Sequence, residues 1–549
     1  MCLHPEDLAM IPEETVRVAR AAFPEGNPYL TLRDELGLLY EDSTFAPLFA
    51  SSRGRPAESP GRLTLLSAVQ FAEGLSDRQA AEQLRARIDL KYLLGLPLTD
   101  PGFHYSALCE HRKRIVENEA QALLLEELLK RLQEKGLIKK RGKQRTDSTH
   151  VLAAIREMNR LECVGETLRH ALNSLAVVVP DWVRSHVPVE WYDRYGRRFE
   201  QWRMPQKDSE WEALFDTVGQ DGYWLLQAVY DPASPSWLRE IPAVQTLRQV
   251  WLQRFYVQGE QLHRRQSNNM PSAERLIISP YDTEARMSIR RTTEWTGYRV
   301  HLSETCEADE PLLITNVETT PGTTPDSELT EPIHQHLAEK DLAPGEHLID
   351  AGYVDAQALA DSEDKYHIDL VGPAPKDTSW QARAGEGFDL ASFRIEWEGR
   401  EAICPQGQRS ACWFEREDSY GTPVIYVKFP KTVCLSCSAR TRCTRSAQEP
   451  RVLKLRPKAH YLALQRARER QTTDEFKAQY AVRSGVEGTI SQGTRAFGLR
   501  RSRYVGLAKT HLQHVLTAIA MDLMRLADWF EGTKRASTRC SAFAALAPA

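Results

Sequence analysis

The sequence predicts a mixed α/β protein that also contains separate all-helical segments. Residues 62–130 carry apolar residues at helical spacing, whereas residues 297–372 contain short apolar or alternating runs typical of strands. A helix is expected between these runs, and that order indicates a mixed sheet. The chain has 549 residues, which is too long for one hydrophobic core, so we expect three or more domains.

The N-terminal segment is predicted to be a helical, helix-turn-helix-like DNA-binding domain. Residues 62–88, RLTLLSAVQFAEGLSDRQAAEQLRARI, are expected to form two helices joined by a turn at Gly74. Ser76 is a favourable N-cap, and Gln79 completes a capping box three residues later. Most such pairs are ordinary helical hairpins, so DNA contact and simple packing both stay open for this unit.

Strand patterns continue after a long interruption. GYRVHLSET (297–305) alternates apolar and polar residues, LLITNVETT (312–320) completes a hairpin, and EHLIDAGY (346–353) is an apolar strand that ends at Asp350. The interruption is rich in tryptophan. A packed helical subdomain is the simpler interpretation, and stacking on unpaired bases is the alternative.

These patterns divide the chain into consecutive parts. The predicted parts are 1–135, N-terminal helical DNA-binding domain; 140–155, first strand of the α/β core; 156–285, helical Trp-rich insertion; 286–380, core continued; 381–450, cysteine-rich insertion; 451–530, glutamate-bearing helix and closing helix; and 531–549, disordered tail.

Four of the ten cysteines lie close together in the sequence. We expect a cytoplasmic, reducing location, where a cysteine cluster indicates metal rather than disulfides. A Cys-x-x-Cys pair with two outlying cysteines suits tetrahedral thiolate zinc. The alternative is a set of unligated thiols. The predicted zinc ligands are Cys404, Cys434, Cys437 and Cys443.

Charge is strongly segregated although the net charge is only −4. Residues 130–145 carry eight Lys and Arg against one Glu, and residues 451–510 carry fourteen Lys and Arg against four acidic residues. Charge runs are usually solvated faces. Two basic blocks in a nearly neutral protein nevertheless predict a polyanion-binding track.

Three acidic residues stand where a metal site is expected. Asp147 and Asp350 lie at or near the ends of predicted strands, where ligand sites of α/β sheets gather, and Glu487 lies on a later helix. Each has an ordinary explanation, since the aspartates could cap turns and Glu487 could pair with Arg483 four residues before it. Together they supply hard oxygen ligands of the kind that Mg²⁺ takes in phosphoryl transfer.

The helix around YAVRSGVEGT (480–489) has unusual features. Tyr480, Arg483 and Glu487 fall on one face among apolar neighbours, so the charged pair is expected within the apolar arc. Gly485 and Gly488 each cost a helix interior about 1 kcal/mol relative to alanine. We therefore expect these glycines to allow the close approach of another backbone.

Several longer motifs are distinctive: TDSTHVLAA, YRVHLSET, DAGYVDA, YAVRSGVEGTISQ, FGLRRSRYVGLAKTHLQHVLTAIA and CPQGQ…CLSCSARTRCT. In these motifs, and along nearly all of residues 20–530, the chain resembles bacterial insertion-sequence transposases of the DDE type, in the group numbered eleven eighty-two. The resemblance implies an RNase H-like core in which Asp147, Asp350 and Glu487 are catalytic and bind two Mg²⁺ ions, with Mn²⁺ as a substitute.

The resemblance also implies DNA contacts. The family signature Tyr-x₂-Arg-x₃-Glu-x₆-Lys is matched except at its last place, where Thr494 stands and Arg495 follows. The implied DNA-binding residues are Tyr480, Arg483, Arg495, Arg500, Arg501 and Arg503. The implied partners are double-stranded DNA, as terminal inverted repeats and as target, and further copies of the chain in a homodimer or larger assembly.

We therefore predict an enzyme, a DNA transposase that binds terminal inverted repeats, cleaves at the element ends and joins 3′-hydroxyls to target DNA. The alternatives are a catalytically inactive DNA-binding protein, either domesticated or a repressor, and a nuclease of the same fold without strand transfer. The chain has no apolar run long enough for a bilayer and no apolar signal core, so we expect a cytoplasmic, bacterial nucleoid-associated protein without membrane contact.

Overall fold

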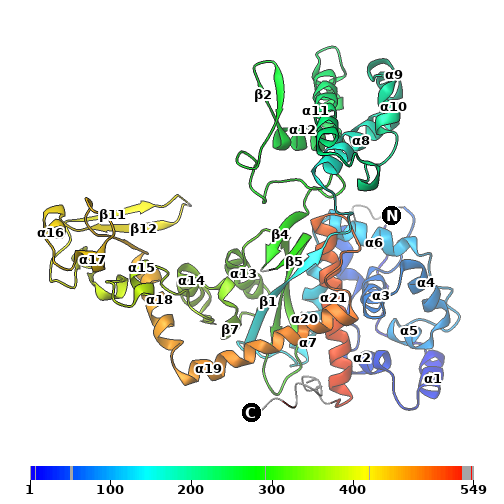
Figure 1. Cartoon of the computed structure of the whole chain (residues 1–549). Coiled ribbons are helices and arrows are strands. Elements are labelled where there is room, and N and C mark those ends of the chain that lie inside the picture. Colours follow the sequence, from blue (N-terminus) through cyan, green and yellow to red (C-terminus); the bar gives the residue numbers. More distant parts are fainter. Residues whose placement is uncertain are drawn as a thin grey trace.

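A mixed sheet lies at the centre of the computed structural model, which describes residues 2–6, 8–49, 54–290, 292–419, 421–533 and 546 (Figure 1). Its strands are β1 (Lys143–Leu152), β4 (Arg286–Arg290), β5 (Thr293–Thr305), β6 (Ile314–Pro321), β7 (Glu346–Ile349) and β8 (Asp369–Val371). Their order is β4-β5-β1-β7-β8, with β6 also beside β5. Strand β5 is antiparallel to β1, β4 and β6, whereas β7 and β8 run parallel to β1. The predicted mixed α/β class is confirmed.

Helices and short 3₁₀ turns accompany this sheet. Those that precede it are α1 (Glu13–Ala22), α2 (Pro28–Leu36), η1 (Asp42–Leu48), α3 (Pro60–Ala72), α4 (Asp77–Ala86), α5 (Ile88–Leu93), α6 (Ser106–Glu117) and α7 (Gln121–Glu134). Those between its later strands and after them are η4 (Asp326–Leu329), α13 (Thr330–Glu339), η5 (Ala351–Tyr353), α14 (Ala356–Tyr366) and the closing helix α21 (Leu507–Phe530).

The predicted helical pair at residues 62–88 is formed by α3 and α4. Gly74 has a φ of +69° in the turn between them, a conformation that favours glycine. Ser76 and Gln79 make the predicted reciprocal capping box. Helix α3 is buried along most of its length, while α4 leaves its polar side exposed.

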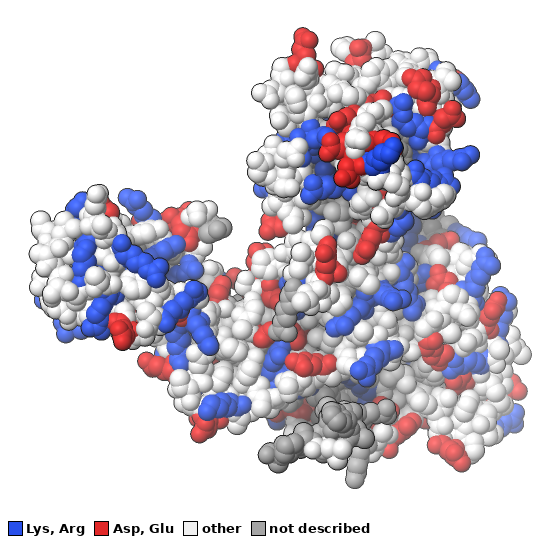
Figure 2. All heavy atoms as spheres, in the orientation of Figure 1, with Lys and Arg blue, Asp and Glu red and all other residues white. Residues whose placement is uncertain are grey.

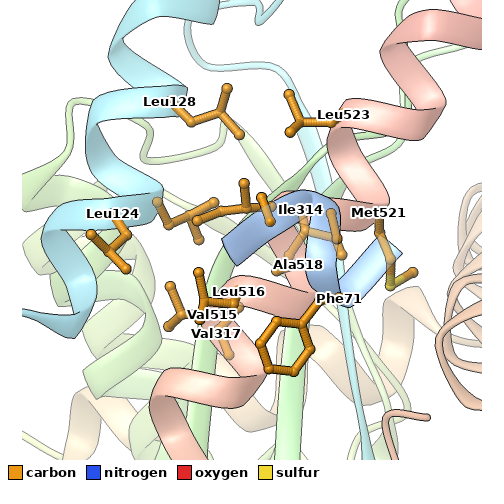
Figure 3. Close-up of a cluster of buried hydrophobic side chains, with 14 of the residues drawn as sticks. Phe71, Leu124, Leu128, Ile314, Val317, Val515, Leu516, Ala518, Met521 and Leu523 are labelled. Atoms are coloured by element: carbon orange, nitrogen blue, oxygen red, sulfur yellow. The ribbon is translucent and has the colours of Figure 1, made fainter. Parts of the chain in front are cut away.

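The N-terminal helices share one hydrophobic core with the sheet. Helix α21 lies between them and β6, and Figure 3 shows how their side chains meet. Phe71 comes from α3, Leu128 from α7, Val317 from β6 and Leu516 from α21. Burial of this apolar surface is the main force that holds the N-terminal part against the central sheet.

Residues between β1 and β4 form a helical unit with a second core. It contains α8 (Arg160–Val178), α9 (Pro180–His186), α10 (Glu190–Tyr195), η2 (Gln201–Arg203), α11 (Asp208–Tyr230), η3 (Ser236–Glu240), α12 (Pro242–Arg254), β2 (Phe255–Gln258) and β3 (Gln261–Arg264). Trp191 and Trp251 are buried in this core, as the packed interpretation predicts. Trp202 is 71% exposed, and base stacking remains a prediction for exposed rings of this kind.

A third, smaller core lies in the cysteine-containing unit, which stands apart from the sheet in Figure 1. Its elements are α15 (Trp380–Ala384), η6 (Leu390–Ser392), β9 (Arg394–Glu396), β10 (Glu401–Ile403), β11 (Cys412–Glu417), β12 (Pro423–Lys428), α16 (Lys431–Leu435), α17 (Arg440–Cys443) and β13 (Val452–Leu455). The return path to the sheet is α18 (Lys458–Arg470), α19 (Asp474–Ala481), η7 (Val482–Ser484) and α20 (Gly485–Ala496).

Two further expectations concern the tail and the membrane. The predicted disordered tail, residues 531–549, falls outside the described residues except for 531–533 and 546. None of the described helices combines the length and the apolar character needed to cross a membrane.

Candidate active site

Strand register brings Asp147 and Asp350 together. Thr146 pairs with Ile349, the last residue of β7, so Asp350 follows directly beside Asp147 on the neighbouring parallel strand. Asp350 lies at a strand end, as predicted. Asp147 instead lies in the middle of β1, because β5 is long enough to pair with that strand as far as Leu152.

Arg483 links these two aspartates to Glu487. Its Nη2 atom lies 2.6 Å from Oδ2 of Asp147 and 4.0 Å from Oδ2 of Asp350. Its Nη1 atom lies 3.4 Å from Oε1 of Glu487. The ordinary i,i+4 pair is therefore present, but the shortest contact of this guanidinium is with Asp147, from a distant part of the chain. Three carboxylates, from β1, from the residue after β7 and from α20, surround one cation.

The predicted burial of the Arg483–Glu487 pair is correct for one partner only. The Arg483 side chain is 11% exposed, whereas the Glu487 side chain is 68% exposed. Residues 482–484 form the 3₁₀ turn η7 rather than a continuous α-helix. Three residues at 120° instead of 100° shift the phase of the following helix by about 60°. Glu487 consequently leaves the apolar arc and faces solvent.

The electrostatics of this site suit a cation. Burial raises the pKa of Asp147 above its ordinary value and the charge of Asp350 adds to this, while Arg483 and the amide of Ser148 oppose it. The Nε atom of Arg483 is buried and has no hydrogen-bond partner in the described part of the chain. Carboxylate oxygens are the ligands that Mg²⁺ prefers, so this donor set fits such an ion chemically.

The present side-chain arrangement places the Arg483 guanidinium, rather than open space, between the carboxylates. Among the described residues, no group of three or more His, Cys, Asp and Glu side chains stands in the geometry of a metal site. Binding of a divalent cation here would therefore require Arg483 to move away from Asp147.

Arg290, at the end of β4, is a residue of this site that the sequence did not reveal. Its Nη2 atom lies 3.8 Å from Oδ2 of Asp350, and its Nη1 atom donates to Oγ of Ser148 at 3.5 Å. Ser148 also donates to Asp326 at 3.2 Å. Neighbouring side chains of a strand point to opposite faces, so Ser148 and Arg290 approach from the side opposite Asp147 and Arg483. The pair of arginines in MSIRRTTEW gives no local sign of this contact.

The predicted DNA-binding residues differ in their surroundings. The half-buried ring of Tyr480 stacks on Phe476, with centroids 5.7 Å apart and planes 8° apart. The Arg495 side chain is exposed near the end of α20. Tyr480 thus supports the helix packing in addition to any DNA contact.

The cluster at 500–503 is only partly free for DNA. Nε of Arg500 donates to Oγ1 of Thr149 in β1 at 2.7 Å, while Arg501 is exposed. The guanidinium of Arg503 lies 4.7 Å from the ring centre of Phe71 in α3. Arg503 therefore fastens this loop to the N-terminal helices. Figure 2 shows that basic residues gather on the cysteine-containing unit and, mixed with acidic ones, across the middle of the same face.

The four predicted zinc ligands do come together. Cys404, Cys434, Cys437 and Cys443 all line one small cavity. Burial raises the pKa of the Cys443 thiol; the other three cysteines add to this, and Arg451 opposes it. The thiols are nevertheless not in metal-binding geometry, so zinc is not supported by this arrangement.

Two family models match separate parts of the chain. The family described as "Transposase domain (DUF772)" matches residues 17–114, which span α1 to most of α6. The family described as "Transposase DDE domain" matches residues 403–527, which include the cysteines, α20 and most of α21. Together the two matches indicate a DDE-type insertion-sequence transposase.

For this transposase, family membership implies a polynucleotidyl-transferase type of enzyme that acts on DNA with a divalent metal, typically Mg²⁺. The matched segments contain Glu487 but neither Asp147 nor Asp350. These two aspartates join the glutamate only through the fold. No curated protein and no solved structure matches this transposase.

Proposed function

We propose that this transposase cleaves DNA at the ends of its element and joins the 3′-hydroxyls to target DNA, with Asp147, Asp350 and Glu487 holding two Mg²⁺ ions. The supporting observation is the convergence of these carboxylates on Arg483, although 203 and 137 positions separate them along the chain. Bound Mg²⁺ would activate the attacking oxygen and stabilise the leaving oxygen of the phosphodiester.

The two arginines have distinct roles in this proposal. Arg483 keeps the carboxylates together before the ions bind and then donates to a DNA phosphate, since a guanidinium matches phosphate oxygens in a bidentate manner. Arg290 lies on the other side of Asp350 and donates to a neighbouring phosphate. Both groups orient the DNA backbone relative to the carboxylates, and orientation is a large part of catalysis in phosphoryl transfer.

We infer that the sheet is an RNase H-like core. The path β6-β5-β1-β7-β8, with three antiparallel strands followed by two parallel ones, supports this inference. The helical unit is then an insertion after the first strand, and the cysteine-containing unit is an insertion before the glutamate helix. Strand β4 is an addition at the edge of this core.

The N-terminal helices are proposed to recognise the terminal inverted repeats. In a helix-turn-helix the second helix enters the major groove, and α4 exposes Arg78 and Arg85 on its polar side. The basic residues of 451–510 would hold phosphates, because affinity for DNA arises largely from charge neutralisation. A homodimer or larger assembly would hold two element ends together.

We also keep structural zinc as a proposal for the four cysteines. Its support is that all four thiols line one cavity beside a small hydrophobic core, and four thiolates are a ligand set that structural zinc takes. Such a site would stiffen the cysteine-containing unit without taking part in the chemistry.

The test is to incubate the purified chain with end-labelled DNA that carries the element ends, with and without Mg²⁺, and to map every product. We expect Mg²⁺-dependent cuts at the ends and covalent joining to a second DNA. Cuts without joining would identify the nuclease alternative. Binding without any cut would identify the inactive DNA-binding alternative and overturn the proposal.

A further inference from the structure

A buried ionic network connects the strand of Asp147 with the closing helix. Arg145 and Glu304 face each other across β1 and β5 and pair at 2.7 Å, with side chains only 6% and 0% exposed. Arg525 of α21 provides a second cation 3.1 Å from the same carboxylate. A buried carboxylate thus lies between two guanidinium groups, an arrangement that is stable only when its geometry is well satisfied.

The same network forms hydrogen bonds with the segment around Glu487, both before and after that residue. Nη1 of Arg145 donates to the carbonyl oxygen of Val482 at 2.7 Å, within η7. The hydroxyl of Thr489 in α20 donates to Glu304 and accepts from Arg525 at 2.7 Å. The two contact points lie five residues before and two residues after Glu487. These hydrogen bonds fix the position of α20 relative to β1.

The two glycines beside Glu487 differ sharply in the space that a side chain would find. A Cβ atom at Gly485 would lie 2.0 Å from Nη1 of Arg145, whereas a Cβ atom at Gly488 would have no described atom within 4 Å beyond its chain neighbours and its own helix backbone. The prediction that both glycines admit another backbone is wrong. Gly485 instead makes room for the Arg145 guanidinium, and Gly488 faces open space.

We propose that Arg145, Glu304 and Thr489 position helix α20 and thereby set the distance of Glu487 from Asp147 and Asp350. Gly485 belongs to the same set, because its lack of a side chain leaves room for the Arg145 guanidinium. The inference rests on the function proposed above. None of the four residues touches the reacting atoms, so all are positioning residues. A displacement of a reacting group by about 1 Å can cost about 10²-fold in rate, which makes the seating of α20 important for activity.

The first test compares Gly485→Ala with Gly488→Ala, two identical changes three residues apart. We expect Gly485→Ala to lower Mg²⁺-dependent end cleavage about 10²-fold through kcat, with nearly unchanged KM for element ends. Its amides at 482–490 should exchange hydrogen faster. Gly488→Ala should cleave within about threefold of the parent, since its methyl group meets no other atom. Equal activity of the two variants would overturn the proposal.

The second test compares Thr489→Val with Thr489→Ser and decides the matter if Gly485→Ala does not fold. Valine keeps the shape and removes the hydroxyl, whereas serine keeps the hydroxyl. We expect a fall in kcat for Thr489→Val and near-parental kcat for Thr489→Ser. An equal reduction of kcat in both variants would indicate that Thr489 acts through packing alone and would overturn the proposal. Glu487→Gln, measured alongside, separates the two proposals: normal cleavage by that variant would refute the proposed function itself.

Discussion

The carboxylate site and the cysteine cluster contain the two sets of residues proposed here as metal ligands, and they are built in opposite ways. The carboxylates come from β1, from the residue that follows β7 and from α20, and both strands contribute side chains to the large core that the sheet shares with α21. The cysteines come from the loop after β10, from α16 and α17, and from the segment between these two helices of five and four residues, beside a small core.

Their charges differ as well. Arg483 and Arg290 lie within 4.0 Å of the carboxylates, so the protein itself supplies cations for that site. Burial and the neighbouring cysteines raise the pKa of the Cys443 thiol, Arg451 opposes this, and Arg440 and Arg451 line the same cavity as the thiols. The carboxylates are therefore held together by ion pairs within the chain, whereas the thiols lie in a small cavity beside an apolar core.

Zinc removal is the largest expected effect. If the cysteines hold zinc, metal analysis should find about one zinc per chain, and Cys437→Ser should lose it. Structural zinc can contribute on the order of 10 kcal/mol to folding, so hydrogen exchange over 404–445 should rise strongly while the sheet stays protected. Unchanged zinc content in the variant would exclude Cys437, and a zinc-free parent would favour unligated thiols.

Neutralising the carboxylates should leave the fold intact and remove the chemistry. Glu487→Gln, Asp147→Asn and Asp350→Asn should each lower end cleavage and joining by at least about 10³-fold, near 4 kcal/mol, while binding element ends like the parent. Double variants should be hardly worse, because a site without its metal has little more to lose. Substantial cleavage by a folded Glu487→Gln variant would mean that this glutamate is only the partner of Arg483 in an ordinary surface ion pair.

The basic residues should affect binding uniformly. Arg500→Ala and Arg501→Ala should weaken binding to all DNA sequences alike and make the dependence of log K on log salt shallower by about 0.9 for each phosphate that the protein no longer neutralises. Arg503→Ala should additionally lower stability, since this side chain packs on Phe71. Reduced affinity for one particular sequence alone would mean that these residues read bases.

Glu318 is a carboxylate of the same sheet, and its partner is the titratable His336. This pair lies outside the proposed site, so its pH dependence reports the contribution of one ion pair to the free energy of unfolding without any effect on catalysis. The hydrogen bond with Glu318 raises the pKa of His336, a contribution present below about pH 6.5 and lost as pH rises through the raised pKa. Burial would raise the pKa of Glu318, but hydrogen bonds from His336 and Asn316 lower it. That contribution is present above about pH 4.3 and lost as pH falls through the lowered pKa.

The Glu318–His336 pair should therefore make its full contribution to folding stability only between about pH 4.3 and 6.5. His336→Gln should destabilise the protein there by less than about 1 kcal/mol, because the histidine is partly exposed, and should be nearly neutral at pH 8. Thermal unfolding at several pH values checks this, with His301, Lys340 and His511 as further charged or titratable groups that face Glu318. A pH-independent difference would contradict the assignment.

Much of this architecture follows from local patterns. The helical pair with its capping box, the hairpin of β5 and β6, and the strand before Asp350 depend on spacing and caps within a few residues. The phase of the glutamate helix was predicted wrongly, since one 3₁₀ turn at 482–484 rotates everything after it. Periodicity cannot detect so short a change in helix type.

Local sequence alone was enough to predict the helical pair, the hairpin of β5 and β6 and the strand before Asp350, because each depends on residues close together in the chain. Which distant groups meet was settled by tertiary packing. Arg145 and Glu304 lie 159 positions apart and pair through strand register, and that contact alone explains why glycine stands at 485. Arg290 reaches Asp350 in the same way. Such contacts depend on how strands and helices dock, and no local pattern encodes that docking.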